Sequence, residues 1–107
     1  MKKDTYLEDL FELQLKNFQI KGFIREYKFL SDRRFKFDFA QLKHKIAVEI
    51  QGKIWHLGGH NSGWGMIRDS EKLALANLNG WTTFFITEPQ VKSEEGIQWI
   101  QKYLESK

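Results

Sequence analysis

Apolar and polar residues alternate in two neighbouring stretches between residues 34 and 53. Three phenylalanines occupy every second position of the first stretch, and three β-branched residues do so in the second: Phe35, Phe37 and Phe39, then Ile46, Val48 and Ile50. A period of two is typical of β-strands. The alternation therefore predicts strands at about 33–41 and 45–51, joined as a hairpin whose two apolar runs face the same core.

The register of this hairpin follows from its apolar pattern. A turn centred at residues 43–44 places Phe39 opposite Val48 on the apolar face and Asp38 opposite Glu49 on the other face. Directly opposed like charges repel each other. A bound divalent cation would reverse the sign of that interaction, because hard cations bind carboxylate oxygens. The alternative is a solvated face on which nearby lysines neutralise the two acids at little energetic gain.

The rest of the chain divides into further predicted elements. Helices are expected at 5–20, 66–79 and after Ser93, strands at 24–30 and 81–87, and a glycine-rich loop at 52–65. The order of helix, three strands, helix, strand and helix predicts an α/β fold with a small mixed sheet. Its last strand follows a helical crossover and can lie parallel to an earlier strand. A length of 107 residues suits a single domain spanning 1–107.

Composition narrows the possible functions. The net charge of +3 is mildly basic and permits nucleic acid as a partner. The absence of cysteine excludes a disulfide framework and cysteine-ligated zinc. No stretch is long and apolar enough for a signal core or a membrane span, so we expect an intracellular, cytoplasmic protein without a membrane partner.

An ordered series of motifs resembles the PD-(D/E)XK nuclease superfamily, in particular its small restriction-like and very-short-patch-repair endonucleases. The series is REYKF, RRFKFDFA, KIAVEIQG, WHLGGHNSGWG, RDSEK and NGWTTFFIT, and it covers nearly the whole chain. The resemblance implies a restriction-endonuclease-like αβββαβα core with a small mixed sheet flanked by helices. It also implies a metal-dependent DNA endonuclease.

The resemblance also implies roles for individual residues. Asp38, Glu49 and the backbone carbonyl of Ile50 would hold Mg²⁺ or Mn²⁺, which activates water and stabilises charge at phosphorus. The motif position that usually carries lysine is Gln51 in this chain. Lys72 on the second predicted helix is the candidate replacement, because some relatives carry their lysine there, and Asp69 is placed to orient it.

Further residues are candidates for the site or for DNA contact, and for some of them a purely structural role is the alternative. Glu8 is either a site acid of the first helix or a solvated residue favoured by the helix dipole. His60 matches a loop histidine of the family, which contacts phosphate or transfers a proton. The expected DNA contacts are Arg33, Arg34, Lys36, Lys53 and Trp64. Trp64 is alternatively a loop anchor.

Two further functions remain alternatives to an endonuclease. One is a nuclease fold with a weakened site that grips DNA without cutting it, which Gln51 favours. The other is a regulatory interaction domain in which Asp38 and Glu49 are only surface charges. For an endonuclease we expect a homodimer on DNA, because cutting both strands needs two sites or two visits.

Overall fold

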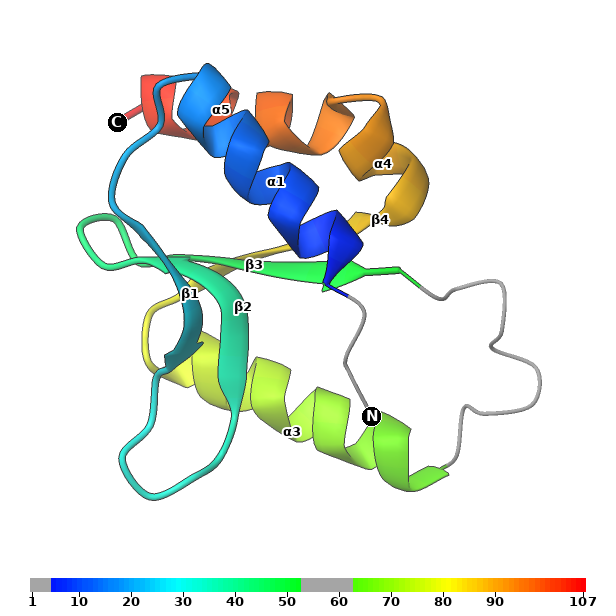
Figure 1. The fold of residues 1–107 in the computed structure, drawn as a ribbon. Helices are drawn as coiled ribbons and strands as arrows, with labels where there is room; N and C mark the ends of the chain where they lie inside the picture. Colours follow the sequence, from blue (N-terminus) through cyan, green and yellow to red (C-terminus); the bar gives the residue numbers. More distant parts are fainter. Residues whose placement is uncertain (1–4, 53–62) are drawn as a thin grey trace.

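The computed structural model describes residues 5–52 and 63–107. The elements run in the order α1 (Tyr6–Asn17), β1 (Phe23–Lys28), β2 (Lys36–Gln41), β3 (Ile46–Gln51), α3 (Gly63–Leu78), β4 (Thr82–Thr87), α4 (Glu88–Lys92) and α5 (Glu95–Glu105). Figure 1 shows a central sheet between two layers of helices.

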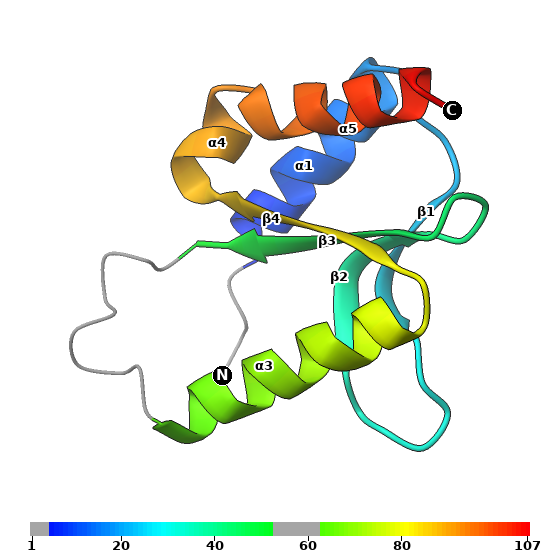
Figure 2. The same cartoon turned by 180° about the vertical axis from the view of Figure 1, so that it is seen from behind.

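The strands form one mixed sheet in the order β1-β2-β3-β4. β2 pairs antiparallel with β1 and with β3, whereas β4 pairs parallel with β3. α3 connects the two parallel strands and covers one face, while α1, α4 and α5 cover the other face (Figures 1 and 2). The predicted mixed sheet flanked by helices is confirmed, including the parallel last strand.

Two cores lie on the two faces of the sheet. The larger core packs against α1, α4 and α5 and contains Phe39, Val48 and Ile50. The smaller core lies against α3 and contains Phe37 and Trp81. Phe37 and Phe39 thus face opposite layers, and the prediction that the whole alternating run shares one core is wrong.

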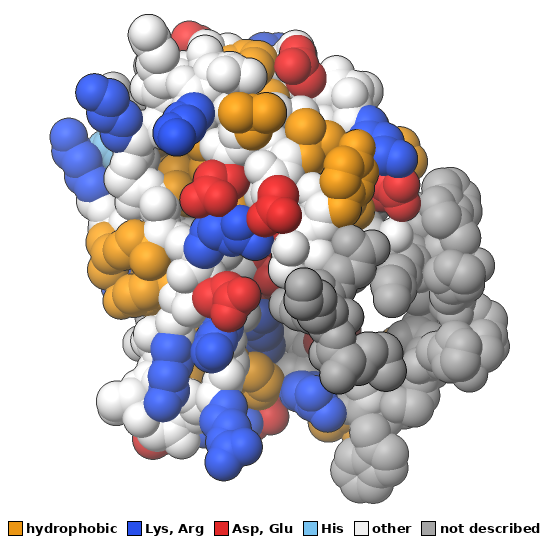
Figure 3. Space-filling model, in the orientation of Figure 1, with side chains coloured by type: hydrophobic (Ala, Val, Ile, Leu, Met, Phe, Trp, Pro, Cys, Tyr) orange, Lys and Arg blue, Asp and Glu red, His pale blue; other side chains and the backbone are white. Residues whose placement is uncertain are grey.

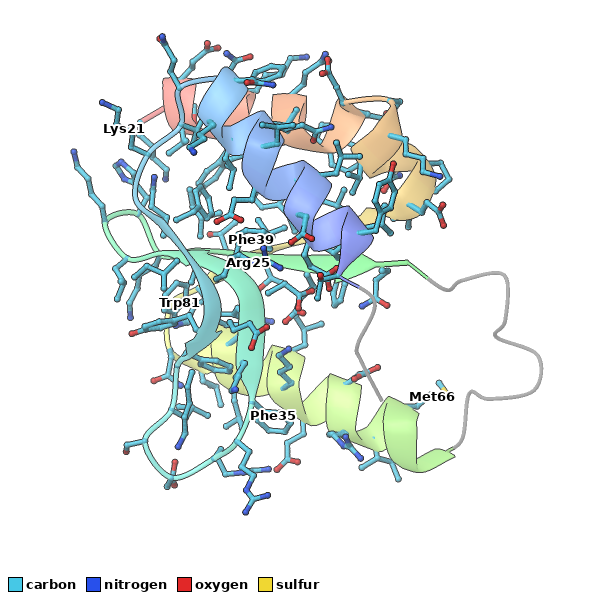
Figure 4. The ribbon with its side chains drawn as sticks, viewed as in Figure 1. Lys21, Arg25, Phe35, Phe39, Met66 and Trp81 are labelled. Atoms are coloured by element: carbon cyan, nitrogen blue, oxygen red, sulfur yellow. The ribbon has the colours of Figure 1, made fainter. Side chains whose placement is uncertain are left out.

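Along β1 and β2, the side chains that pack inward switch from the α1 layer to the α3 layer. This switch is centred on Glu26 of β1, which adopts a φ of +52°. A left-handed non-glycine residue interrupts regular strand geometry. Arg25, before it, lies over the ring of Phe39 on the side of α1, whereas Tyr27, after it, contacts Trp81 on the side of α3. β2 pairs with β1 on both sides of this point. In Figure 4, Arg25 and Phe39 lie together toward α1, whereas Trp81 lies on the side of α3.

The segment after β4 differs from its prediction. α4 begins at once after Thr87, where the backbone N–H of Thr87 donates to the side chain of Gln90 at 3.0 Å in a capping box. This short helix was not predicted, because a run of five residues has no helical period to detect. The N-cap position of α5 is Glu94, whose side chain makes no capping hydrogen bond. The Oγ of Ser93 accepts from the backbone N–H of Glu95, the first residue of α5, at 3.2 Å, so the predicted capping role of Ser93 is confirmed.

The helix between the parallel strands starts earlier than predicted. It begins at Gly63 instead of residue 66. Residues 53–62, which make up most of the predicted glycine-rich loop, lie outside the described part of the chain. None of the helices in the described ranges combines the length and the apolar content needed to cross a membrane.

Candidate active site

Asp38 lies at the point where β2 and β3 separate. Their ladder ends at the pair of Phe39 with Val48, which is the predicted register. Asp38 is the residue of β2 that precedes Phe39. Its Oδ2 accepts a hydrogen bond from the backbone N–H of Ile50 at 2.7 Å. The carboxylate therefore replaces a backbone acceptor, and the predicted direct pairing of Asp38 with Glu49 is not part of the ladder.

Glu49 lies on β3 and faces α3. It is only 8% exposed, and its Oε1 forms an ion pair with Nζ of Lys72 from α3. Nζ of Lys72 lies 5.7 Å from the centre of the Phe37 ring, and that ring stacks on Phe29 at 4.1 Å. The aromatic core beneath α3 thus positions the lysine beside the glutamate.

The surroundings of Glu49 disfavour its charged form. Burial, the largest cause, raises the pKa of this carboxyl from its ordinary 4.5 to about 7. Lys72 acts in the opposite direction and lowers the pKa, while the negative charges of Asp38 and Asp69 raise it further. The charges of half-buried Asp38 and exposed Asp69 thus act on the buried Glu49, and a cation near the three acids would relieve their repulsion.

A pocket between α3 and the β3–β4 side of the sheet brings three of the predicted site residues together, Glu49, Gln51 and Lys72. Its polar lining comes from Glu49, Gln51, Asp69 and Lys72. Its apolar walls are Phe37, Leu73, Ala76 and Phe85. Thr83 also lines the pocket, and its Oγ1 is buried without a hydrogen-bond partner in the part of the chain that the structure describes. The pocket thus joins residues from β2, β3, α3 and β4.

A wider groove adjoins this pocket and shares Asp69 and Lys72 with it. Its cations come from the β1–β2 connection, the start of β2 and α3: Arg33, Arg34, Lys36 and Arg68. Arg33 pairs with Glu71 at 2.7 Å and lies over the ring of Phe35 at 4.9 Å. Several Lys and Arg side chains are visible in the lower half of the face in Figure 3, with acidic side chains among them, and Figure 4 shows Phe35 beside α3. With Lys72 the groove has five cations against three acids, Asp32, Asp69 and Glu71. The excess of positive charge suits a polyanion.

Asp38 and Ile50 do not line the pocket, although the charge of Asp38 acts on Glu49 and its carboxylate accepts from the N–H of Ile50. Four further predicted site residues are placed in neither the pocket nor the groove by the described structure. Glu8 is half-buried on α1, on the face of the sheet opposite α3, and is not among the charges that shift the pKa of Glu49. Lys53 and His60 fall outside the described residues. Trp64 belongs to α3, but its side chain is not described. Their predicted roles stay predictions.

Sequence reasoning missed Thr83 and Phe85. Both lie on β4, whose parallel pairing with β3 sets Phe85 beside Glu49 and Thr83 beside Ala47. Alternate residues of a strand share a face, so the placement follows as soon as β3 and β4 are known to be neighbours. The sequence allowed a parallel last strand without identifying its partner.

The residues present suit a hard divalent cation. Asp38, Glu49 and the carbonyl of Ile50 offer only oxygen donors. Within residues 5–52 and 63–107, no group of three or more His, Cys, Asp and Glu side chains is arranged to hold a metal ion. Water or substrate oxygens would therefore complete the coordination, which is the usual arrangement for Mg²⁺.

The stability of the metal-free protein should depend on the Glu49 proton. Between pH 4.5 and about 7, the folded protein keeps a proton that the unfolded chain releases. The free energy of unfolding should therefore fall as the pH rises through this range, by about 3 kcal/mol in total. Urea denaturation in EDTA at pH 5 and pH 8 measures the fall.

Glu49→Gln is the matched control, because glutamine has the same shape and no titrating proton. The difference in stability between wild type and this variant should change with pH by the same amount. A pH dependence that is equal in the two proteins would contradict the assigned environment of Glu49.

Comparison with known proteins gives one informative similarity. No family model and no curated protein sequence matches the chain. The solved structure of the homing endonuclease I-Bth0305I catalytic domain is similar, with a TM-score of 0.70 and 20% sequence identity over 94% of each chain. The two chains therefore share a fold over nearly their whole length.

Proposed function

We propose that this chain is a metal-dependent DNA endonuclease of the PD-(D/E)XK type, similar to small restriction-like and very-short-patch-repair enzymes. The observation that carries the proposal is the buried ion pair of Glu49 with Lys72, close to Asp38 and open to a basic groove. The fold shared with the catalytic domain of a homing endonuclease supports it.

Each residue of the candidate site has a distinct part in this proposal. Asp38, Glu49 and the carbonyl of Ile50 would hold Mg²⁺ or Mn²⁺, which when bound would supply an activated water and charge stabilisation at phosphorus. The ammonium of Lys72 balances the negative charge that develops on the phosphate. The apolar walls around them, including Phe37, keep bulk water away and strengthen these electrostatic interactions.

The groove is the proposed path of the DNA backbone. Arg34, Lys36 and Arg68 line it and contact phosphates on one side of the reacting bond. Arg33 contributes less net charge, because Glu71 already pairs with it. Most of these contacts are sequence-independent, so specificity rests on the shape of the DNA.

A DNA-binding module without cleavage is the second candidate function. Gln51 favours it, because this residue occupies the motif position where lysine is usual and lines the pocket. The interaction-domain alternative loses its basis, since it requires solvated acids and Glu49 is buried. Cleavage of supercoiled plasmid distinguishes the first two functions.

The proposed enzyme acts as a homodimer on DNA. One chain contributes one pocket, and a duplex has two strands of opposite polarity. A two-fold axis relates two identical sites to those strands.

Metal binding should be visible as stabilisation of the fold. Millimolar Mg²⁺ or Mn²⁺ is expected to raise Tm by mass action and to support cleavage in a panel of duplex, nicked, mismatched and junction DNA. Ca²⁺ should raise Tm with little cleavage. Thermal melting and gel assays measure these effects, and Asp38→Asn should remove the rise in Tm. A Tm indifferent to all three ions would contradict the metal site.

A further inference from the structure

The outer edge of β4 is an unprotected sheet edge. β4 is the last strand of the sheet order, and no strand in the described ranges pairs with its far side. Its sequence, TTFFIT, contains no charge and no proline. Natural sheet edges usually carry charges, proline or bulges that prevent pairing with another chain. The absence of charge and proline leaves the backbone groups of this edge open to pairing with another strand.

The two faces of β4 differ in how they are covered. Thr82 and Phe84 face α5, where both contact Tyr103, at 3.2 Å between hydroxyls and 5.6 Å between ring centres. Phe85 faces the side of α3 and is 47% exposed, beside Leu73, which is 38% exposed. Both side chains also line the pocket of the candidate active site, so exposed apolar side chains lie at the β4 edge next to that pocket.

The sequence of β4 is suited to pairing with itself. In an antiparallel pair of identical strands, a two-fold axis sets one residue opposite its own copy. A register centred on Phe85 sets Phe85 opposite Phe85, Phe84 opposite Ile86, and Thr83 opposite Thr87. Aromatic pairs, aromatic with β-branched pairs and threonine pairs are the favourable cross-strand combinations. A register centred on Phe84 keeps an aromatic pair, Phe84 with Phe84, and an aromatic with β-branched pair, Thr83 with Phe85, but it loses the threonine pair.

We propose that β4 pairs antiparallel with β4 of a second copy of this chain, in the register centred on Phe85, and that the two sheets become one. The two-fold axis then runs perpendicular to the joined sheet, so both copies of α3 lie on the same face. Because Phe85 and Thr83 also line the pocket, each pocket lies directly beside the interface.

The arrangement matters for the proposed function. Two pockets on one face of a continuous sheet can meet the same DNA duplex, as cutting of both strands requires. This use of the dimer rests on the endonuclease proposal, whereas the pairing itself does not. Exposed apolar area on β4 and α3 would be buried whether or not the pockets cleave DNA.

Engineered cysteines test the pairing, because the natural chain contains none. Phe85→Cys should give a covalent dimer on mild oxidation, without DNA or metal, since directly opposed side chains lie roughly 5 Å apart at Cβ. Leu13→Cys is the control, at an exposed position of α1 on the opposite layer. Non-reducing gels should show at least tenfold faster cross-linking at position 85.

Sedimentation of untreated protein gives a second measurement. Wild type should contain dimer at about 100 µM, and Phe85→Lys should be a monomer with an unchanged circular dichroism spectrum, because position 85 is exposed. Equal cross-linking at positions 85 and 13, or a wild type that is monomeric throughout, overturns the pairing. A dimer that cleaves no DNA overturns the endonuclease proposal alone, and a monomer that cleaves overturns only the pairing.

Discussion

Glu49→Gln is expected to reduce DNA cleavage by ~10³-fold or more while the protein stays folded. The carboxylate is a proposed metal ligand, and the charge stabilisation that a metal supplies is worth several kcal/mol, with a factor of ten in rate for each 1.4 kcal/mol. Glutamine keeps the shape of the side chain in its buried position but loses the charge. Single-turnover cleavage of a labelled duplex at saturating Mg²⁺ measures the loss.

Asp38→Asn should have a similar effect for a related reason. The amide oxygen of asparagine still accepts the hydrogen bond from the backbone of Ile50, so the end of the β2–β3 ladder remains intact. Glu12→Gln is the control for both variants. Like them, it replaces a carboxylate by an amide, but at an exposed position of α1. Near wild-type cleavage by either site variant would refute the assignment of the metal ligands.

The hairpin shows how far the sequence alone determines the fold. The register of β2 with β3 was predicted correctly, because a shift by one residue would move every side chain to the opposite face. The separation of Phe37 from Phe39 was not predictable in the same way. Both layers accept a phenylalanine, and the twist at Glu26 has no signature in the apolar pattern.

In the candidate site, too, some features could be predicted from the sequence and others could not. Asp38 and Glu49 stand out locally, because charged residues interrupt apolar strands. Lys72 was proposed from the family resemblance, and the structure brings it to Glu49. The burial of Glu49 and the contribution of Phe85 depend on contacts between elements distant in sequence. Such contacts follow from the packing of α3 and β4, which no short window of sequence contains.

Lys72→Met should cost ~10²–10³-fold in cleavage, and Gln51→Met should cost much less. A positioned donor or charge that stabilises the transition state is worth this amount, and Nζ of Lys72 is already held between Glu49 and the ring of Phe37. Methionine keeps most of the packing of the lysine stem. Gln51 is exposed at the end of β3 and carries no charge to lose.

The two substitutions form a matched pair, because both introduce the same side chain into the lining of one pocket. DNA affinity measured by fluorescence anisotropy in Ca²⁺ separates a loss of binding from a loss of catalysis. If Lys72 stabilises the transition state, Lys72→Met should bind DNA within about threefold of wild type and lose mainly the rate of the chemical step. The reverse ranking of the two variants would assign the role of the motif lysine to Gln51 or to Lys53.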